Sequence, residues 1–347
     1  MRQTSPLSIL VAVACALFML TACSIEPEDE EVVVQLTPVS ADQLKIFGTL
    51  PEVAAPVNYE MSEELTDLGR MLYYEQRISA NGNMSCNTCH GLNNYGIDGL
   101  RFSFGHTGNP VGRNSPSVYN AALHVAQFWD GRAADVEEQA KGPILAAGEM
   151  GMPSGDEVVA RLNDIPDYLP YFEAAFPGED DPITYDNVGT AIGAFERRLI
   201  TPGRFDAFLA GDETALTARE QEGLSLFVNT GCTACHYGPA LGGNSYAALG
   251  AQEPSVPNDL GRYVVTGNEA DMHVFKVPSL RNIAVTGPYL HDGSIPTMEA
   301  MVQLMVRHQL GRELTSDQVD TMVIFLRSLT GELPADYTAA PELPGLE

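Results

Sequence analysis

Two short motifs of identical spacing carry the residues best suited to chemistry, CNTCH at 86–90 and CTACH at 232–236. Two thiols three positions apart can each add across a vinyl group of one porphyrin, and the next histidine then presents its imidazole to the iron. The sequence therefore predicts two covalently attached c-type haems. The attachment residues would be Cys86, Cys89, Cys232 and Cys235, and the proximal iron ligands His90 and His236.

A zinc site built from the two Cys-x-x-Cys pairs, or a redox dithiol, is the competing interpretation. A histidine follows both pairs, similar helical patterns precede both, and the start of the chain is typical of an exported protein. These three features together favour haem over zinc.

The first residues predict an exported leader, and their end resembles a bacterial lipoprotein signal. The apolar run at 10–20 is shorter than the roughly 20 residues that a membrane-spanning helix needs. The resemblance implies a signal peptide over 1–22, a lipid on Cys23 and an acidic tether over 23–45. It also implies a periplasmic protein that is anchored to the outer membrane by lipid alone.

The whole sequence carries 46 acidic against 19 basic side chains, a formal net charge of −27. Such a balance argues against nucleic acid as a partner. An acidic surface would steer cationic proteins toward it. Generic solubility, or a saline habitat, explains the same charge equally well.

The elements that must position these motifs occur twice. A helical pattern precedes each motif, at 65–73 and at 220–227, and another closes each half, at 188–199 and at 319–329. Thr217 with Glu220, and Thr315 with Gln318, predict capping boxes.

Between the motifs and the closing helices, residues 91–116 and 238–278 are rich in Gly, Pro and Asn, which predicts loops wrapped around haem. We therefore expect a mainly α fold of two cytochrome c-like domains packed about a pseudo-two-fold. The expected domains are 46–202 and 203–335, followed by a tail at 336–347.

The sixth iron ligands decide between electron carrier and enzyme, because only a removable or absent ligand opens the iron to a substrate. Composition alone leaves nine candidates open: His106, His124, His273, His291, His308, Met272, Met298, Met301 and Met305.

From Leu68 to Gly331 the sequence resembles the bacterial di-haem cytochrome c peroxidases. The phrases that carry the resemblance are GRNSP at 112–116, QFWDGRA at 127–133, QAKGP at 139–143, FKVPSLRN at 275–282, YLHDGS at 289–294 and QLGREL at 309–314. By this resemblance the N-terminal haem is peroxidatic, with His106 as a removable ligand in the resting oxidised enzyme. The C-terminal haem would transfer electrons, with Met305 opposite His236.

The resemblance also implies three catalytic side chains. Glu149 would shuttle the proton that peroxide needs when its O–O bond breaks, and Gln139 would hydrogen-bond the bound peroxide. Trp129, the only tryptophan, would be an electron bridge between the haems. His291 is treated as structural.

A calcium ion between the domains is implied, held by the side-chain oxygen of Asn114 and the carbonyls of Thr286 and Pro288. The resemblance further implies hydrogen peroxide as substrate, a small cytochrome c or blue-copper protein as donor, and a homodimer. Two alternatives stay open: an electron-transfer protein with both irons closed, and a related di-haem enzyme that forms tryptophylquinone. The latter group uses a tyrosine where this chain has Met305.

Overall fold

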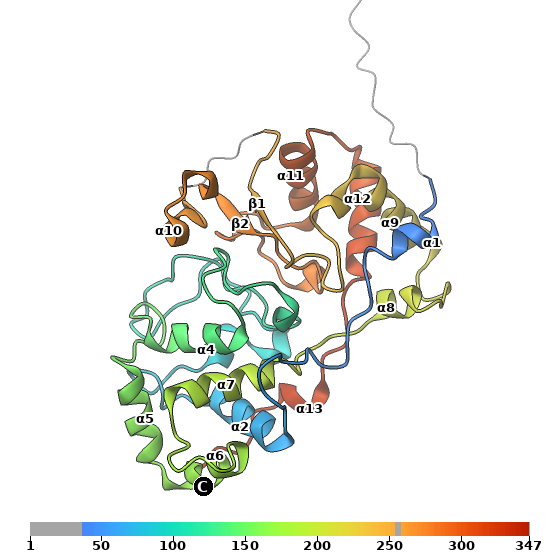
Figure 1. The fold of residues 1–347 in the computed structure, drawn as a ribbon. Coiled ribbons are helices and arrows are strands. Elements are labelled where there is room, and N and C mark those ends of the chain that lie inside the picture. The colour runs from blue at the N-terminus through green and yellow to red at the C-terminus, as the bar shows by residue number, and fades with distance from the viewer. Residues whose placement is uncertain (1–36, 254–257, 347) are drawn as a thin grey trace, which may run out of the picture. The chain divides into compact units, whose positions relative to one another are not determined.

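The computed structural model describes residues 37–253 and 258–346. The predicted signal peptide, Cys23 and most of the predicted tether lie outside these residues. The described part is mainly helical, as expected, and is drawn in Figure 1. Within it, no helix has the length and apolar character needed to cross a bilayer.

The first half contains six α-helices, of which the helix that begins with Cys86 is a single turn. They are α2 (Glu63–Tyr74), α3 (Cys86–Cys89), α4 (Val136–Leu145), α5 (Gly155–Asn163), α6 (Leu169–Ala175) and α7 (Tyr185–Glu196). Short 3₁₀ turns lie at Leu92–Asn94, Ala121–Leu123 and Pro166–Tyr168. The helices predicted at 65–73 and 188–199 are thus confirmed as α2 and α7, although α7 ends at Glu196.

The second half repeats the order of an opening helix, a haem motif, a long loop and a closing helix. Its helices are α8 (Arg204–Leu209), α9 (Ala218–Thr230), α10 (Tyr263–Thr266), α11 (Met298–Leu310) and α12 (Ser316–Arg327), with 3₁₀ turns at Cys232–Ala234, Glu269–Asp271 and Ile283–Val285. Both predicted capping boxes are present. The loop contains a feature that the sequence did not predict, an antiparallel pair of strands β1 (Tyr246–Ala248) and β2 (Val274–Lys276).

In each half the opening helix packs against the closing helix, α2 on α7 and α9 on α12. Gly69 of α2 faces the carbonyl of Ala191, and Gly223 of α9 faces the carbonyl of Thr321, so closely that neither position has room for a side chain. The two glycines therefore set the helix–helix distance in both halves, which supports an internal repeat. The pseudo-two-fold arrangement of the halves stays a prediction.

The two ends of the described chain pack on opposite halves. Phe47, which follows α1 (Ala41–Leu44), is buried in the core built by α9, α11 and α12. Tyr337, in α13 (Ala335–Thr338), packs on the core of α2 and α7, and Arg77 donates to the carbonyl of Pro344 at 2.8 Å. Figure 1 shows α1 beside α9 and α13 beside α2 and α7. Each end of the described chain thus packs on the half that lies farther away in the sequence, and the predicted tether, domain and tail boundaries stay a prediction.

A buried hydrogen-bond network joins the halves. Asn120 and Asn282 both adopt left-handed backbone conformations, and their side-chain amides donate to the hydroxyl of Thr201 at 2.8 and 2.9 Å. The amide oxygen of Asn120 accepts from the backbone N–H of Thr201, and that of Asn282 accepts from Gly331. Because buried amides need partners, this network fixes the two closing segments side by side.

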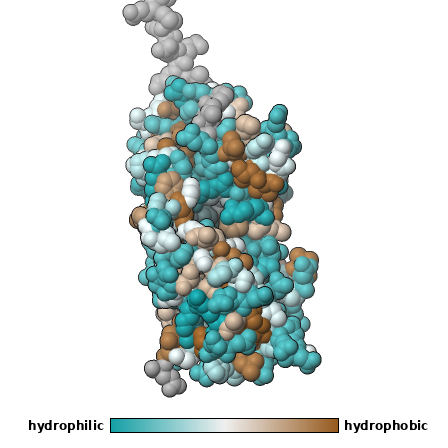
Figure 2. Space-filling model, turned by 90° about the vertical axis from the view of Figure 1, so that its left-hand side faces the viewer, coloured by the Kyte–Doolittle hydropathy of each residue, from teal (hydrophilic) through white to brown (hydrophobic). Residues whose placement is uncertain are grey.

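On the face shown in Figure 2, hydrophobic residues form small separate patches among hydrophilic ones. Scattered apolar residues of this kind are normal for a protein surface and need no partner to cover them.

Replacing Gly223 by alanine tests the close helix crossing. The new methyl group would overlap the Thr321 carbonyl and push α9 from α12, so we expect the free energy of unfolding to fall by about 1–3 kcal/mol. Gly148→Ala is the matched control, because a methyl group there meets open space. Equal thermal unfolding temperatures for both variants would contradict the proposed role of the glycine.

Candidate haem cavities and active site

A cavity in the first half collects most of the residues predicted for the N-terminal site. Cys86 and Cys89, at the two ends of α3, line it together with His90. Gln139 from α4 and Glu149 from the following turn line the same cavity. The structure thus places the predicted acid and amide in the cavity that holds the first haem motif.

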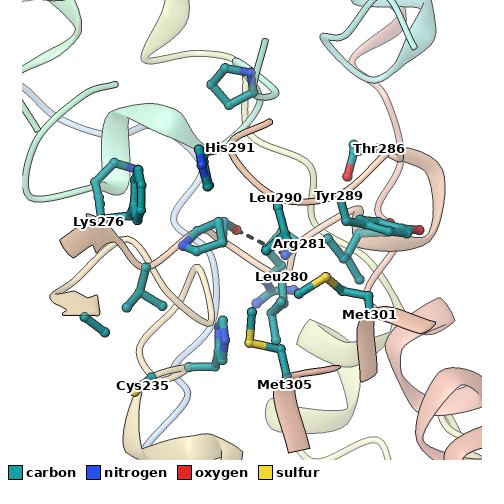
Figure 3. A pocket seen from close by; sticks show the side chains of 18 of the residues that line it. Cys235, Lys276, Leu280, Arg281, Thr286, Tyr289, Leu290, His291, Met301 and Met305 are labelled. Atoms are coloured by element: carbon teal, nitrogen blue, oxygen red, sulfur yellow. Dashed lines mark hydrogen bonds between the residues drawn. The ribbon is translucent and has the colours of Figure 1, made fainter. Parts of the chain in front are cut away.

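A second cavity contains Cys232, Cys235 and His236. Met301 and Met305, one turn apart on α11, both extend into it (Figure 3). Met298 also lines this cavity, so position alone does not choose among the three methionines as iron ligand. Met305 as the ligand stays a prediction.

Both proximal histidines are oriented by the same kind of hydrogen bond. Nδ1 of His90 lies 3.3 Å from the carbonyl oxygen of Gly96, and Nδ1 of His236 lies 3.1 Å from that of Leu241. Burial lowers the pKa of His90 and lowers that of His236 to about 4, so both rings are neutral at pH 7. A neutral ring whose Nδ1–H is held by a carbonyl offers Nε2 to a metal.

The four thiols of the described residues are free and line the cavities in two pairs. Burial raises the pKa of Cys89 to about 11 and that of Cys232 to about 12, which disfavours the reactive thiolate of a redox dithiol. Paired thiols, a neutral imidazole beside each pair and a cavity around them fit covalently attached haem.

Glu149 is partly buried, and burial raises its pKa, whereas the nearby Arg132 lowers it. Arg132 stacks on the ring of Phe128 at 3.4 Å and pairs with Asp130 at 2.9 Å. A carboxyl group whose pKa is raised by burial beside a cavity is suited to hold and release a proton.

His106 does not line the first cavity in this structure. Its Nε2 lies 3.2 Å from the carbonyl oxygen of Ala147, and its ring packs closely on Gly151. Its Nδ1 is buried without a hydrogen-bond partner. Ligation of iron by His106 would therefore require its loop to move, and this role stays a prediction.

Trp129 and Asn114 line both cavities. The indole Nε1–H donates to the backbone carbonyl of Asn114 at 2.9 Å, and the backbone N–H of Lys276 donates to the carbonyl of Trp129 at 2.8 Å. The indole is thus fixed between the two haem motifs. His291 packs edge-on against Trp129 and stacks on Phe275, which agrees with a structural role.

Thr286 and Pro288 line the second cavity together with Asn114. The side-chain amide N–H of Asn114 donates to the carbonyl of Leu100 at 2.9 Å. In residues 37–253 and 258–346, no group of three or more His, Cys, Asp or Glu is placed to hold a metal ion. The predicted calcium site uses amide and carbonyl oxygens, so this finding does not bear on it.

Sequence reasoning missed the other charged groups at the cavities. Arg113 joins the halves at the first cavity, with a bidentate pair to Asp259 at 2.6 and 2.8 Å and a 2.6 Å contact to Asp130. Glu196, at the end of α7, is buried and lines the same cavity, and Lys276 lines the other. Arg113 and Lys276 lie in the sequence phrases quoted above, but only the fold reveals their burial and partners.

Two cavities, each with a thiol pair and an oriented imidazole, define a di-haem c-type cytochrome. The sequence profile of the family described as di-haem cytochrome c peroxidase matches residues 63–214. The cytochrome c551 peroxidase of Nitrosomonas europaea is 45% identical over 288 residues, which cover 82% of this chain and 84% of that protein. The cytochrome c551 peroxidase of Pseudomonas aeruginosa is 40% identical over 305 residues, 85% of this chain and 88% of that protein.

Among solved structures, a MauG-like protein associated with microbial copper homeostasis superposes with a TM-score of 0.73 at 31% identity. The alignment covers 84% of this chain and 95% of that one. The chain therefore belongs to the di-haem cytochrome c peroxidase family, and the resemblance seen in its sequence is confirmed.

The pH dependence of stability tests whether Glu196 is buried and protonated in the first cavity. Burial, followed by the nearby Glu137, raises its pKa to about 8, so the folded protein holds a proton that the unfolded chain releases above its ordinary pKa. Stability should then fall by about 1 kcal/mol per pH unit as the pH rises from about 5 to 8. Glu196→Gln removes this loss.

We expect Glu196→Gln to raise the unfolding temperature relative to wild type more at pH 8 than at pH 5. Glu138→Gln, an exposed position on α4, is the control and should show no such pH dependence. A Glu196→Gln effect of equal size at both pH values would show that Glu196 is ionised in the folded protein.

Proposed function

We propose that this protein is a periplasmic peroxidase that reduces hydrogen peroxide to water, with electrons from a small cytochrome c or a blue-copper protein. The observation that carries the proposal is the sharing of one cavity by His90, Glu149 and Gln139, while the methionine-rich α11 lines the other. Among the described residues, a proton-holding acid thus lines only the cavity of the first haem motif. This difference between the two cavities favours an enzyme over an electron carrier in which both irons keep a sixth ligand.

The haem attached at Cys86 and Cys89 would supply the iron where peroxide is reduced, and the haem attached at Cys232 and Cys235 would store an electron. The chain's own residues do the rest. The amide of Gln139 can donate a hydrogen bond to peroxide and orient it, because an amide keeps its proton at any pH of interest. The Glu149 carboxyl then gives its proton to the departing oxygen and is reprotonated from solvent.

Trp129 supports electron passage because its indole is held between the two motifs and lines both cavities. His106 is proposed to ligate the first iron in the resting oxidised state and to leave on reduction. Its neighbours Gly105 and Gly108 permit such a loop movement, since Gly108 already adopts a positive φ of 75°. Activity is then expected to need pre-reduction.

Calcium bound by Asn114, Thr286 and Pro288 is proposed to hold the region between the motifs in its active arrangement. Asn114 supports this role because it is buried, lines both cavities and accepts the hydrogen bond of Trp129. A homodimer and a lipid on Cys23 complete the proposal, supported by the family resemblance and the lipoprotein-like leader. The tryptophylquinone-forming alternative is disfavoured by Met305, where those enzymes use tyrosine.

Glu149→Gln tests the proton shuttle. The amide cannot give up a proton, so kcat for peroxide should fall by about 10²–10⁴-fold while both haem spectra stay unchanged. The matched control is Glu138→Gln, which removes an acid from nearby α4 outside the cavity. Turnover retained in Glu149→Gln would remove Glu149 from the mechanism.

Chelation tests the calcium proposal. Treating the half-reduced enzyme with a calcium chelator should lower the rate of peroxide consumption, and added Ca²⁺ should restore it better than Mg²⁺, which demands stricter octahedral geometry. The metal content is measured in the same samples. Full activity in protein shown to be free of calcium would contradict the proposal.

A further inference from the structure

The second cavity contains a buried cation without a carboxylate partner. This chain has three lysines. Lys45 pairs with Asp42, and Lys141 pairs with Glu138 and Asp186. Lys276 is 8% exposed, and its ammonium has one hydrogen-bond partner, Nδ1 of His124 at 3.2 Å. Burying an uncompensated charge is costly, so an anion is expected at this place.

The protein supplies no such anion to the cavity. No Asp or Glu is among the residues that line it, in the part of the chain that the structure describes. Its other cationic side chain, Arg281, is already paired with Asp206 at 2.7 and 2.8 Å. The remaining ionisable groups on its wall are His124, His236, His291, two tyrosines and the two thiols.

His124 adds a second, independent donor. Its Nδ1 accepts the hydrogen bond of Lys276, so the ring proton resides on Nε2, and Nε2 is buried without a partner. Burial lowers the pKa of His124 well below its usual value and lowers that of Lys276 to about 8. Both pKa values fall because the groups are buried and no negative charge of the described residues lies beside them.

A haem carries two propionate carboxylates, which are the anions that enter with it. We infer that Lys276 and His124 together bind a propionate of the haem attached at Cys232 and Cys235, on the side of the cavity next to Trp129. Figure 3 shows Lys276 in this cavity with Met301 and Met305. Lys276 is anchored there because β2 donates its backbone N–H to the Trp129 carbonyl.

The pairing has a consequence for electron storage. A fixed positive charge near a haem favours the reduced iron and raises its reduction potential. Lys276 is thus a positioning residue that seats the propionate and keeps the second haem the better electron acceptor. The inference rests on haem attachment at Cys232 and Cys235 and not on peroxidase activity.

The test is redox titration of the second haem in the full holoprotein. In Lys276→Gln we expect the equilibrium constant for its reduction to fall at least about tenfold, which is about 59 mV for a one-electron couple. Lys276→Arg keeps the charge and should retain the wild-type potential within a small fraction of that shift. Lys141→Gln, which removes a paired lysine outside both cavities, should leave the potential unchanged. An unchanged potential in Lys276→Gln overturns the inference.

Infrared redox-difference spectra with isotope-labelled propionates separate pairing from a general charge effect. A desolvated propionate without a cation has a raised pKa. In wild type we expect one propionate of the second haem to absorb as a carboxylate throughout pH 5 to 7, and in Lys276→Gln that propionate should protonate in this range. A lower potential with unchanged propionate bands would show that Lys276 acts from a distance, which overturns the pairing.

Should Lys276→Gln fail to accumulate with two haems, the wild-type spectrum alone decides. If both propionates of the second haem protonate between pH 5 and 7 in the wild-type protein, neither is paired with a cation, and the inference then fails. These spectra do not depend on peroxidase activity. A failure of the proposed function can therefore be distinguished from a failure of the propionate pairing.

Discussion

Each haem site depends on one hydrogen bond, from the ring of the proximal histidine to a carbonyl of the loop that follows it. In both halves this bond sets the tautomer of a neutral imidazole, through Gly96 for His90 and through Leu241 for His236. The ring must also stand at the correct angle to the thiols that precede it. Both carbonyls belong to residues in the left-handed backbone region, Gly96 and Leu241, so a turn shortly after each haem motif brings the acceptor to the ring.

The two cavities share this design but differ in charge. Four acids line the first, namely Asp130, Glu149, Glu196 and Asp259. Arg113 pairs with both aspartates, and burial favours the protonated forms of the two glutamates. The second contains no acid among its described lining residues, and Lys276 is its unpaired cation. The first cavity thus offers carboxyl groups that can hold protons, whereas a cation near the second haem favours its reduced iron. The two halves of this internal repeat thus differ in the residues that line their cavities, as an enzyme with one reactive and one electron-storing haem requires.

Sequence reasoning predicted the parts of this molecule that local patterns determine. The four principal helices and both capping boxes follow from spacing over a few residues, and the haem motifs are local as well. The strands β1 and β2 were missed because their pairing joins segments that are nearly thirty residues apart in a glycine-rich loop. The contacts of His106 with Ala147 and Gly151 depend on the tertiary structure, and no pattern in the sequence indicates them.

The charge and burial of the residues that line the cavities could not be predicted from the sequence either. A lysine in a sequence is by default a solvated side chain, and only the fold shows that Lys276 is buried without a carboxylate. The same holds for Glu196, whose neighbours include Tyr73 of α2, Glu137 of α4 and Cys86 of the first haem motif. Site residues of this kind are recognised from their surroundings in the folded protein and not from their residue type.

Because each end of the described chain packs on the opposite half, a single cut in the chain cannot separate the two halves cleanly. Phe47 belongs to the core of the second half, and Tyr337 to that of the first. Neither half is therefore a contiguous stretch of sequence, and cutting the chain near residue 202 would strip each fragment of an apolar contact. Exchanging one half for a foreign cytochrome domain would therefore require the chain end that packs on it to be exchanged as well.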